Sequence, residues 1–191
     1  MSSVLHLVDR EQLTYDGTQL TSLWAFRRYR LQGDSIVSFR GSCRVDVDKL
    51  VDAQDALDGA FIYSPDMLHF IVEHFDLDLE KAVYRQRMLI VLIRETLEKA
   101  VGGGVISRAG DDLFVGERKL SVSIATVSPV STLIHIGLNL NAEGAPVPAI
   151  GLGDLGLSGE AVYELASRVC AAYAAEVAGI FQARCKVRGV S

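Results

Sequence analysis

Two neighbouring stretches in the second half of the chain alternate between apolar residues and small or polar ones. In Lys119–Ala125 the even positions are apolar, and in Val130–Asn141 the even positions from Val130 to Leu140 are apolar or Thr. Successive side chains of a strand point to opposite faces, so this pattern predicts two strands that pair in a sheet. We expect the apolar rows to pack on helices and the opposite rows to form a shallow polar floor.

Two longer stretches have a helical pattern. Leu79–Val101 follows Asp78, a good N-cap residue, and it ends at three consecutive glycines, 102–104, which cannot continue a helix cheaply. Its middle is apolar all round, which indicates a buried central helix. Residues 158–183 repeat apolar positions at three- and four-residue steps and predict a terminal amphipathic helix.

The remaining elements are shorter. We predict an edge strand at Ser3–Val8, a strand at Ser35–Phe39, and a helical turn or two at Met67–His74 after a strand at 61–63. The stretch Leu20–Tyr29 fits either a short helix or a strand. Strands before and after a central helix, with hairpin-type spacing, predict an α+β fold: a mixed, mostly antiparallel sheet with helices packed on one face, in a single domain spanning residues 1–191.

The composition of the chain limits the kinds of partner it can bind and the cellular compartment in which it is expected. The chain has 191 residues, a formal net charge of −5 and three cysteines without CxxC spacing. A mildly acidic chain argues against nucleic acid or an anionic membrane surface as a partner, and unpaired cysteines are typical of a reduced, cytoplasmic protein. The amino-terminal sequence has no signal-peptide pattern, and no apolar run is long enough to cross a membrane. No metal site is predicted, because His69 and His74 lie five residues apart and not four.

Lys119 is the strongest candidate for a catalytic or ligand-binding residue. It opens a strand whose neighbours on the same face are Ser121 and Ser123, so there is room for a ligand beside its ammonium group. That group suits a carboxylate or phosphate, although a lysine in a hairpin also commonly extends into water. Asp111 and Asp112 precede the strand and fit either a turn or a site for a ribose, an ammonium group or Mg²⁺.

A second candidate is the sequence Arg40-Gly41-Ser42-Cys43-Arg44, which follows a predicted strand. Exposed backbone N–H groups beside two guanidinium groups would form a cradle for an anion. Cys43 between two arginines would have a depressed thiol pKa, so it could carry an acyl group as a nucleophile.

The polar row of the later strand supplies further candidates. His135, Gly137 and Asn139 lie on the predicted floor. Gly137 marks a place where a backbone or ligand approaches closely. His135 fits either a hydrogen-bonded core histidine or a base.

The segment GDDLFVGERKLSVSIA, followed by LIHIGLNLN, resembles the core of biotin and lipoate protein ligases. In this resemblance, Asp111 and Asp112 stand where that family has Asn-Asp, and Lys119 stands where it has an adenylate-contacting lysine. Gly137-Leu138-Asn139 stands where the family has Gly-Ile-Asn. The ligases' Gly-Arg-Gly-Arg loop is absent, and only residues 40–44 lie in a comparable place.

Longer stretches, YDGTQLTSLWAF, IYSPDMLHFIVEHF and RKLSVSIATVSPVSTLIHIGLN, resemble the domain of unknown function 366 family. The resemblance covers nearly the whole chain. It implies the fold shared by biotin/lipoate ligases and class II aminoacyl-tRNA synthetases.

Three functions remain open at this point. One is an acyl- or adenylate-handling ligase or transferase acting on a small carboxylic acid, with ATP and Mg²⁺ as cofactors if it forms an adenylate. Here Lys119 would neutralise developing charge and Arg40 and Arg44 would close over the acid or nucleotide. A second is a non-catalytic module that binds a metabolite or partner in the same pocket. The third is a structural homodimer.

Overall fold

A five-stranded sheet forms the centre of the computed structural model, which describes residues 4–59 and 61–190. Its strands, in spatial order, are β1 (Leu5–Gln12), β2 (Ser35–Val45), β3 (Ile62–His74), β8 (Thr132–Asn141) and β7 (Ser121–Val127). β1 is parallel to β2, and all the other neighbours are antiparallel. The predicted mixed, mostly antiparallel sheet is therefore confirmed. The edge strand predicted from Ser3 is β1, and Ser3 itself lies outside the described residues.

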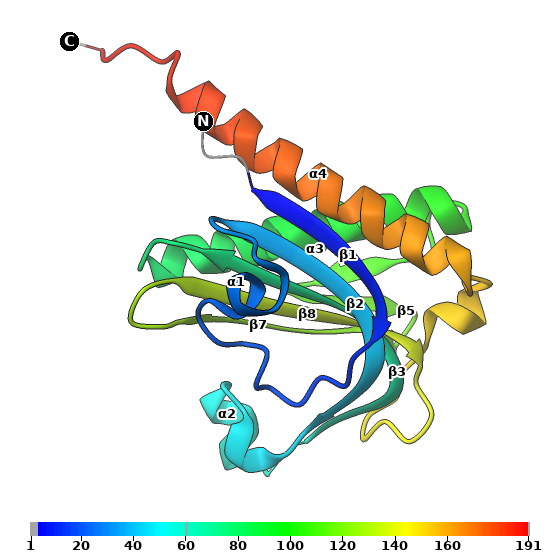
Figure 1. Cartoon of the computed structure of the whole chain (residues 1–191). Helices are drawn as coiled ribbons and strands as arrows, with labels where there is room; N and C mark the ends of the chain where they lie inside the picture. The colour runs from blue at the N-terminus through cyan, green and yellow to red at the C-terminus, as the bar shows by residue number, and fades with distance from the viewer. Residues whose placement is uncertain (1–3, 60, 191) are drawn as a thin grey trace.

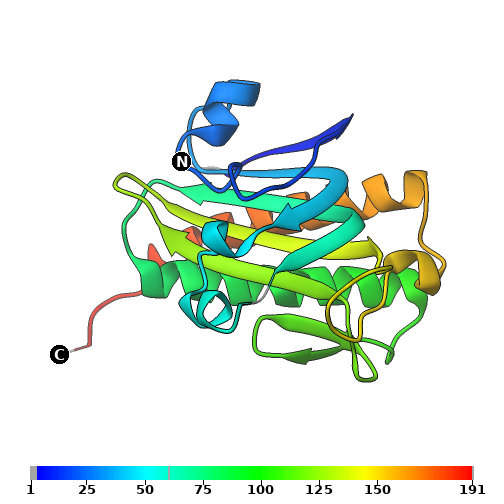
Figure 2. The ribbon, with the colours of Figure 1, turned by 90° about the horizontal axis from the view of Figure 1, so that it is seen from below.

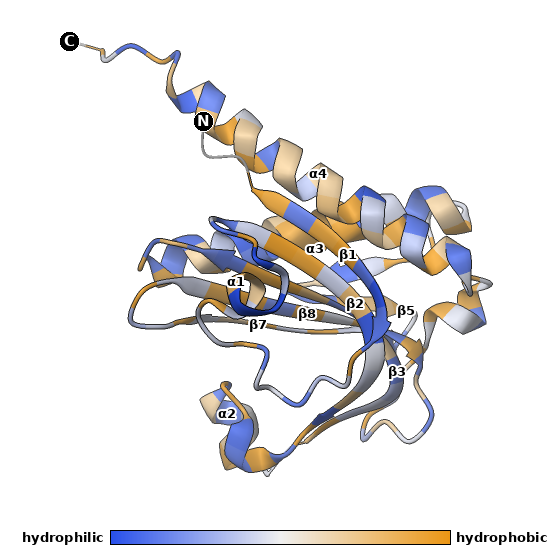
Figure 3. Ribbon diagram, in the orientation of Figure 1, coloured by the Kyte–Doolittle hydropathy of each residue, from blue (hydrophilic) through white to orange (hydrophobic). Residues whose placement is uncertain are grey.

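Both long helices cover one face of this sheet (Figures 1 and 2). They are α3 (Leu79–Val101) and α4 (Glu160–Arg184), and a core of buried apolar side chains lies between them and the strands. Hydrophobic residues recur along β1, β2 and the adjoining helices (Figure 3). The α+β class with helices on one face is confirmed. No helix in the described part of the chain has the length and apolarity needed to cross a membrane.

The ends of α3 follow from its sequence. The Asp78 side chain accepts a hydrogen bond of 3.0 Å from the N–H of Lys81, which satisfies one of the free donors of the first turn. Gly102, with φ 82°, ends the helix in a conformation that favours glycine. The short elements α1 (Trp24–Tyr29), η1 (Val47–Lys49) and α2 (Ala53–Leu57) complete the first half of the chain, so the 20–29 stretch is partly helical.

The prediction of a helix at Met67–His74 is wrong, because these residues continue β3. The Ser64 hydroxyl lies 2.8 Å from the carbonyl oxygens of Asp66 and of Asn141 in β8, which share its single proton. The pairing with β8 shifts register between Asp66 and Met67. From Met67 to His74 every residue of β3 is buried, so both faces carry core side chains. Burial on both faces hides the two-residue period on which a strand prediction depends.

A second, smaller sheet lies beside the first. It consists of β4 (Ser107–Ala109), β5 (Asp112–Val115) and β6 (Arg118–Lys119), with a turn at Gly116-Glu117 between the last two. Lys119 is further held by the loop that precedes η2 (Leu152–Leu155), because its N–H donates to the Pro148 carbonyl and its own carbonyl accepts from Ile150.

The predicted apolar row of the strand after Lys119 is divided between the two faces of the sheet. Ser123 pairs with Ile136, which belongs to the helix-facing core, whereas Ile124 pairs with His135 on the opposite face. Leu120 lies in the break between β6 and β7 and packs in the helix-facing core. The alternation does not continue through this break, so the prediction that Leu120, Val122 and Ile124 share one face is wrong.

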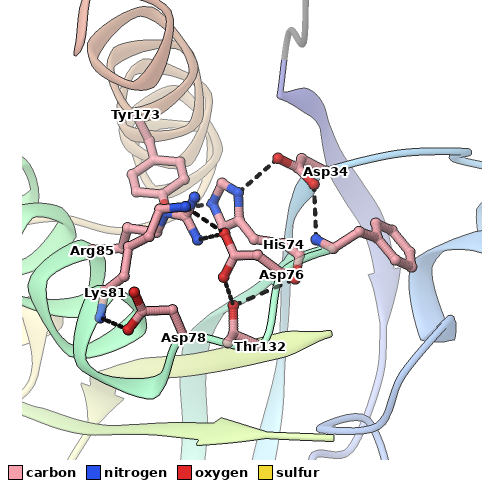
Figure 4. Close-up of polar contacts among 9 residues, drawn as sticks. Asp34, His74, Asp76, Asp78, Lys81, Arg85, Thr132 and Tyr173 are labelled. Atoms are coloured by element: carbon pink, nitrogen blue, oxygen red, sulfur yellow. Dashed lines mark hydrogen bonds and ion pairs between the residues drawn. The ribbon is translucent and has the colours of Figure 1, made fainter. Parts of the chain in front are cut away.

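A buried polar network joins the helices to the end of β3 (Figure 4). His74 Nδ1 lies 2.9 Å from an Asp34 carboxylate oxygen, and its Nε2 lies 2.8 Å from the Tyr173 hydroxyl of α4. Arg85 of α3 donates to Asp76 at 2.8 Å. Burial alone would raise the pKa of Asp34, but the hydrogen bonds from His74 and a backbone N–H outweigh it and lower that pKa. The network fixes both helices against the sheet.

Candidate functional site

The face of the sheet opposite the long helices carries a cavity of about 560 Å³, a size typical of small-molecule sites. Its floor comes from β3, β7 and β8, and its walls come from the segments around residues 15–20, 45–63, 111–119 and 145–149. The residues that line it from the strands of this sheet are Val45, Ile62, Tyr63, Met67, Ser121, Val122, Ser123, Ile124, His135 and Asn139. Apolar side chains thus alternate with a few polar ones around one hollow.

The structure brings part of the predicted site together. The cavity is lined by Asp111, Asp112, Lys119, Ser121, Ser123, His135 and Asn139. The predicted residues outside its lining are Arg40, Gly41, Ser42, Cys43, Arg44 and Gly137. The lysine and the histidine–asparagine floor therefore share one cavity, whereas the proposed arginine cradle does not reach it.

Lys119 lies at the wall of the cavity with about one third of its side chain exposed, and its ammonium is 2.9 Å from a carboxylate oxygen of Asp112. Burial raises the pKa of Asp112, and the hydrogen bond from Lys119 opposes this rise only in part. Burial therefore weakens the hold of the Asp112 carboxylate on Lys119, and an anion that enters the cavity would compete with it for the ammonium group.

The Asp111 carboxylate borders the cavity, but its polar contacts are with side chains of α3 and β7. Its carboxylate accepts from Gln86 at 2.9 Å and from Ser123 at 2.8 Å, and it pairs with Arg87 at 3.2 Å. Asp111 also follows Gly110 in the turn between β4 and β5, so the turn prediction holds.

The two predicted floor serines have structural partners. Ser123 donates to Asp111, and the Ser121 hydroxyl accepts a hydrogen bond of 2.9 Å from the N–H of Leu113. Both serines pair with helix-facing residues of β8 because of the break at Leu120. The prediction that they lie on the same face as His135 is wrong, although both border the cavity at the edge of the sheet.

His135 is a buried histidine with defined partners. Tyr15 stacks on its ring with a centroid distance of 3.8 Å, and its Nε2 lies 3.1 Å from Nδ1 of His69. Burial lowers the pKa of His135 well below its usual value, and the neighbouring His69 lowers it further. A neutral, hydrogen-bonded core histidine fits these contacts.

Asn139 and Gly137 complete the floor. The Asn139 amide donates to the Lys119 carbonyl at 3.4 Å, which links β8 to the small sheet. A Cβ atom at Gly137 would lie 2.2 Å from the Met67 sulfur and 3.1 Å from a Val122 methyl group. The close approach predicted at Gly137 is therefore made by side chains of the floor itself.

The prediction of an anion cradle at residues 40–44 is wrong. These residues lie inside β2, where their backbone groups pair with β3 on one side and with residues 13–15 on the other. Arg40 alternates with Ile36 onto the helix-facing side and is paired with Asp66. Arg44 is exposed and lies 3.4 Å from Asp46. Neither guanidinium closes over the cavity.

The prediction of a reactive thiol at Cys43 is wrong as well. Cys43 is fully buried in the core on the cavity side of the sheet, and burial raises its pKa to about 12. At neutral pH it is a protonated thiol without access to substrate, so it cannot act as the nucleophile.

Gly41 has a structural role: it lets a neighbouring backbone segment pack closely against β2. A Cβ atom at this position would lie 2.2 Å from the backbone oxygen of Leu13, which runs alongside β2 and donates its own N–H to the Arg40 carbonyl. The segment after Leu13 carries Tyr15 over the cavity floor, so the missing side chain lets this segment dock.

We expect Gly41→Ala to lower the free energy of unfolding by about 2–3 kcal/mol, because the backbone at Leu13 must move. Urea denaturation measures the change. Gly179→Ala is the matched control: no atom within 4 Å opposes a Cβ there, and alanine favours the α4 helix, so stability should be unchanged or higher. Equal effects of the two substitutions would contradict this role for Gly41.

Several lining residues were not predicted, among them Tyr15, Lys49, Met67, Val122 and Ile124. The sequence pattern predicts a helix at Met67 and places Val122 and Ile124 on the opposite face of their strand. Tyr15 precedes a turn signal, and nothing in a turn indicates that its aromatic ring covers a sheet. His69 lies two residues after Met67 in β3, so a strand prediction for this segment would have placed both side chains on the cavity face.

Within the described residues, no group of three or more His, Cys, Asp or Glu side chains is placed to hold a metal ion. A magnesium ion that arrives with a nucleotide keeps water and phosphate ligands and needs only one or two protein carboxylates. Asp112, which lines the cavity beside Lys119, is one carboxylate that would be placed to hold such an ion.

The fold defines a class of protein. Protein Ta0514 from T. acidophilum with bound lipoic acid superimposes with a TM-score of 0.56 at 15% identity, covering 91% of this chain and 85% of that one. Biotin protein ligase from Aquifex aeolicus in complex with biotin and ATP gives a TM-score of 0.54 at 14% identity, covering 88% and 70%. The chain therefore has the fold of the biotin/lipoate ligase catalytic core.

Within that class, the chain belongs to the family described as "Domain of unknown function (DUF366)", whose model matches residues 4–188. The uncharacterized protein MJ0805 of Methanocaldococcus jannaschii is 40% identical over 161 residues, covering 81% of this chain and 71% of that protein. A solved structure described as a protein of unknown function from Pyrococcus horikoshi is 41% identical, with a TM-score of 0.91 over 99% of this chain and 100% of that one.

Proposed function

We propose that this protein binds a small carboxylic acid in the cavity and activates it as an adenylate-forming ligase or acyltransferase. The observation that carries the proposal is Lys119, a partly exposed ammonium group at the wall of a cavity whose floor combines apolar and polar side chains. A carboxylate can displace Asp112 from Lys119 while its hydrocarbon part lies against Met67 and Val122. The ligase-core fold supports the same proposal.

The proposed reaction joins the acid to ATP. A carboxylate oxygen attacks the α-phosphorus of ATP, the bond from that phosphorus to the bridging oxygen of pyrophosphate breaks, and pyrophosphate leaves. Lys119 stabilises the negative charge that develops on the phosphoryl oxygens. Magnesium would accompany the triphosphate and neutralise part of its charge.

A second candidate is a non-catalytic module that binds a metabolite in this cavity. The positions of two arginines favour this candidate, because neither can contact a ligand in the cavity. Arg40 lies on the helix-facing side beside Asp66, and Arg44 pairs with Asp46. Adenylate formation needs charge on the polyphosphate, and Lys119 with Lys49 are the cationic side chains at the cavity wall among the described residues.

Pyrophosphate release separates the two candidates. The protein is incubated with ATP, Mg²⁺ and a panel of small carboxylic acids, and both pyrophosphate and the thermal midpoint Tm are measured. A ligase releases pyrophosphate with at least one acid. A binding module shows a rise in Tm with a metabolite and no release with any acid. A panel without release and without a shift in Tm would contradict both.

A further inference from the structure

Two histidines lie side by side on the cavity face of the sheet. His135 of β8 lines the cavity, and His69 of β3 lies beside it, with a distance of 3.1 Å between His135 Nε2 and His69 Nδ1. The other nitrogen of His69, Nε2, lies 3.3 Å from the Gly41 carbonyl oxygen. Both rings are buried, and Tyr15 and Phe39 stack on them.

The Gly41 carbonyl decides which nitrogens carry protons. Burial lowers the pKa of both rings, to about 3 for His69, so each ring is neutral near pH 7 and has one N–H. A carbonyl only accepts, so the His69 proton is on Nε2 and its Nδ1 is bare. His135 must then donate from Nε2, which leaves its own Nδ1 without a proton. The reverse assignment would place a lone pair of His69 against the carbonyl oxygen.

His135 Nδ1 has no hydrogen-bond partner among the described residues, yet it is not a buried orphan. In that part of the chain Arg87 Nε alone is a buried side-chain nitrogen or oxygen without a partner. The Nδ1 atom therefore keeps a small accessible surface, and His135 lines the cavity. Tyr15 covers a face of the ring, so the ring offers the cavity an edge with a fixed lone pair.

We propose that His135 is a specificity-determining acceptor, held in one tautomer by His69, and that the ligand carries a neutral N–H or O–H donor at the end remote from its carboxylate. This inference rests on the proposed function in taking the cavity to bind a carboxylic acid. His135 contacts the ligand, and His69 is the positioning residue behind it.

The dimensions of the floor fit an elongated ligand. Asn139, which donates to the Lys119 carbonyl, and His135 lie on the same face of β8 four residues apart, about 13 Å along a strand. Between them, at Gly137, the Met67 sulfur and a Val122 methyl group fill the floor. The ligand class is therefore a carboxylic acid with an apolar middle and a neutral donor at its far end.

The tautomers are measured on the wild-type protein by long-range ¹H–¹⁵N correlation NMR at pH 7. We expect His69 and His135 to be neutral, each with its proton on Nε2. A proton on Nδ1 of His135, or a charged ring at either residue, would overturn the proposal. This measurement needs no ligand and does not depend on how well any variant folds.

The ligand class is tested by calorimetry with matched probes: straight-chain acids of six to ten carbons with a terminal hydroxyl, and their terminal methyl ethers. We expect the best hydroxy acid to bind roughly tenfold more tightly than its ether, because the ether leaves the buried acceptor unpaired. In His135→Phe, which keeps a ring against Tyr15, the ratio should fall to about one. An unchanged ratio in this variant, a wild-type ratio near one, or no binding of any hydroxy acid would overturn the ligand assignment.

The outcomes for this inference and for the proposed function are distinguishable. A hydroxyl preference that depends on His135, without pyrophosphate release, leaves the inference standing and removes the catalytic proposal. Pyrophosphate release from acids that show no such preference, unaltered by His135→Phe, leaves the proposed function standing and removes the inference.

Discussion

Lowering the pH from 6.5 to 4.5 is expected to reduce the free energy of unfolding by up to about 5 kcal/mol through two residues, His69 and His135. Both side chains are buried, and burial lowers the pKa of each, to about 3 for His69. Two such groups contribute about 1.4 kcal/mol each per pH unit over a range of two units. Urea denaturation at half-unit steps of pH measures the change.

The sign follows from proton binding. Below its ordinary pKa of about 6.5 a histidine in the unfolded chain takes up a proton, whereas the same ring in the folded protein stays neutral until its lowered pKa is reached. The unfolded state therefore gains protons first, and stability is complete above pH 6.5 and lost as the pH falls. The buried neighbours Tyr15 and Cys43 do not offset this, because burial raises the pKa of both and keeps them neutral.

The difference in slope between wild type and His135→Phe isolates the contribution of His135 from that of the other titrating groups. We expect the variant to lose about half of the slope between pH 6.5 and 4.5. His6, which is exposed on β1, provides the matched control: His6→Gln should leave the slope as it is. A wild-type curve that is flat over this range would show that the histidines are not buried in neutral form.

The elements that could be predicted from the sequence are those whose signals are local. Asp78 and Gly102 bound α3 because a cap and a left-handed glycine act within one turn of the helix. The alternation in β8 survives because it carries one consistent apolar face, from Ile134 to Leu140. These elements, in chain order, suffice for the α+β class.

The failures share a physical cause, which is that burial is decided by elements distant in sequence. Met67–His74 reads as a helix because both faces of β3 are covered, by α3 and α4 on one side and by the segment around Tyr15 on the other. The sequence around Arg40 predicts a ligand-binding residue, because the sequence does not show that Asp66 lies within hydrogen-bonding distance of its guanidinium group. The histidine pair could not be found while His69 was assigned to a helix.

Replacing Lys119 is the test with the largest expected effect on activity. We expect Lys119→Ala to lower the rate of pyrophosphate release by roughly a hundredfold to a thousandfold, the usual loss when one charge-stabilising donor is removed from an active site. Where an acid raises Tm without turnover, the same substitution should abolish that rise. The fold should persist, because the Lys119–Asp112 pair is partly exposed and contributes below about 1 kcal/mol.

The neighbouring residue provides the control. Arg118 belongs to the same short strand and has the same charge, but it is exposed and does not line the cavity. Arg118→Ala should therefore leave both pyrophosphate release and the ligand-induced shift unchanged. Equal losses in the two variants would mean that the acid responds to the general charge of this strand and not to an ammonium group at the cavity wall. In that case the proposed chemistry fails, although the ligase-core fold stands.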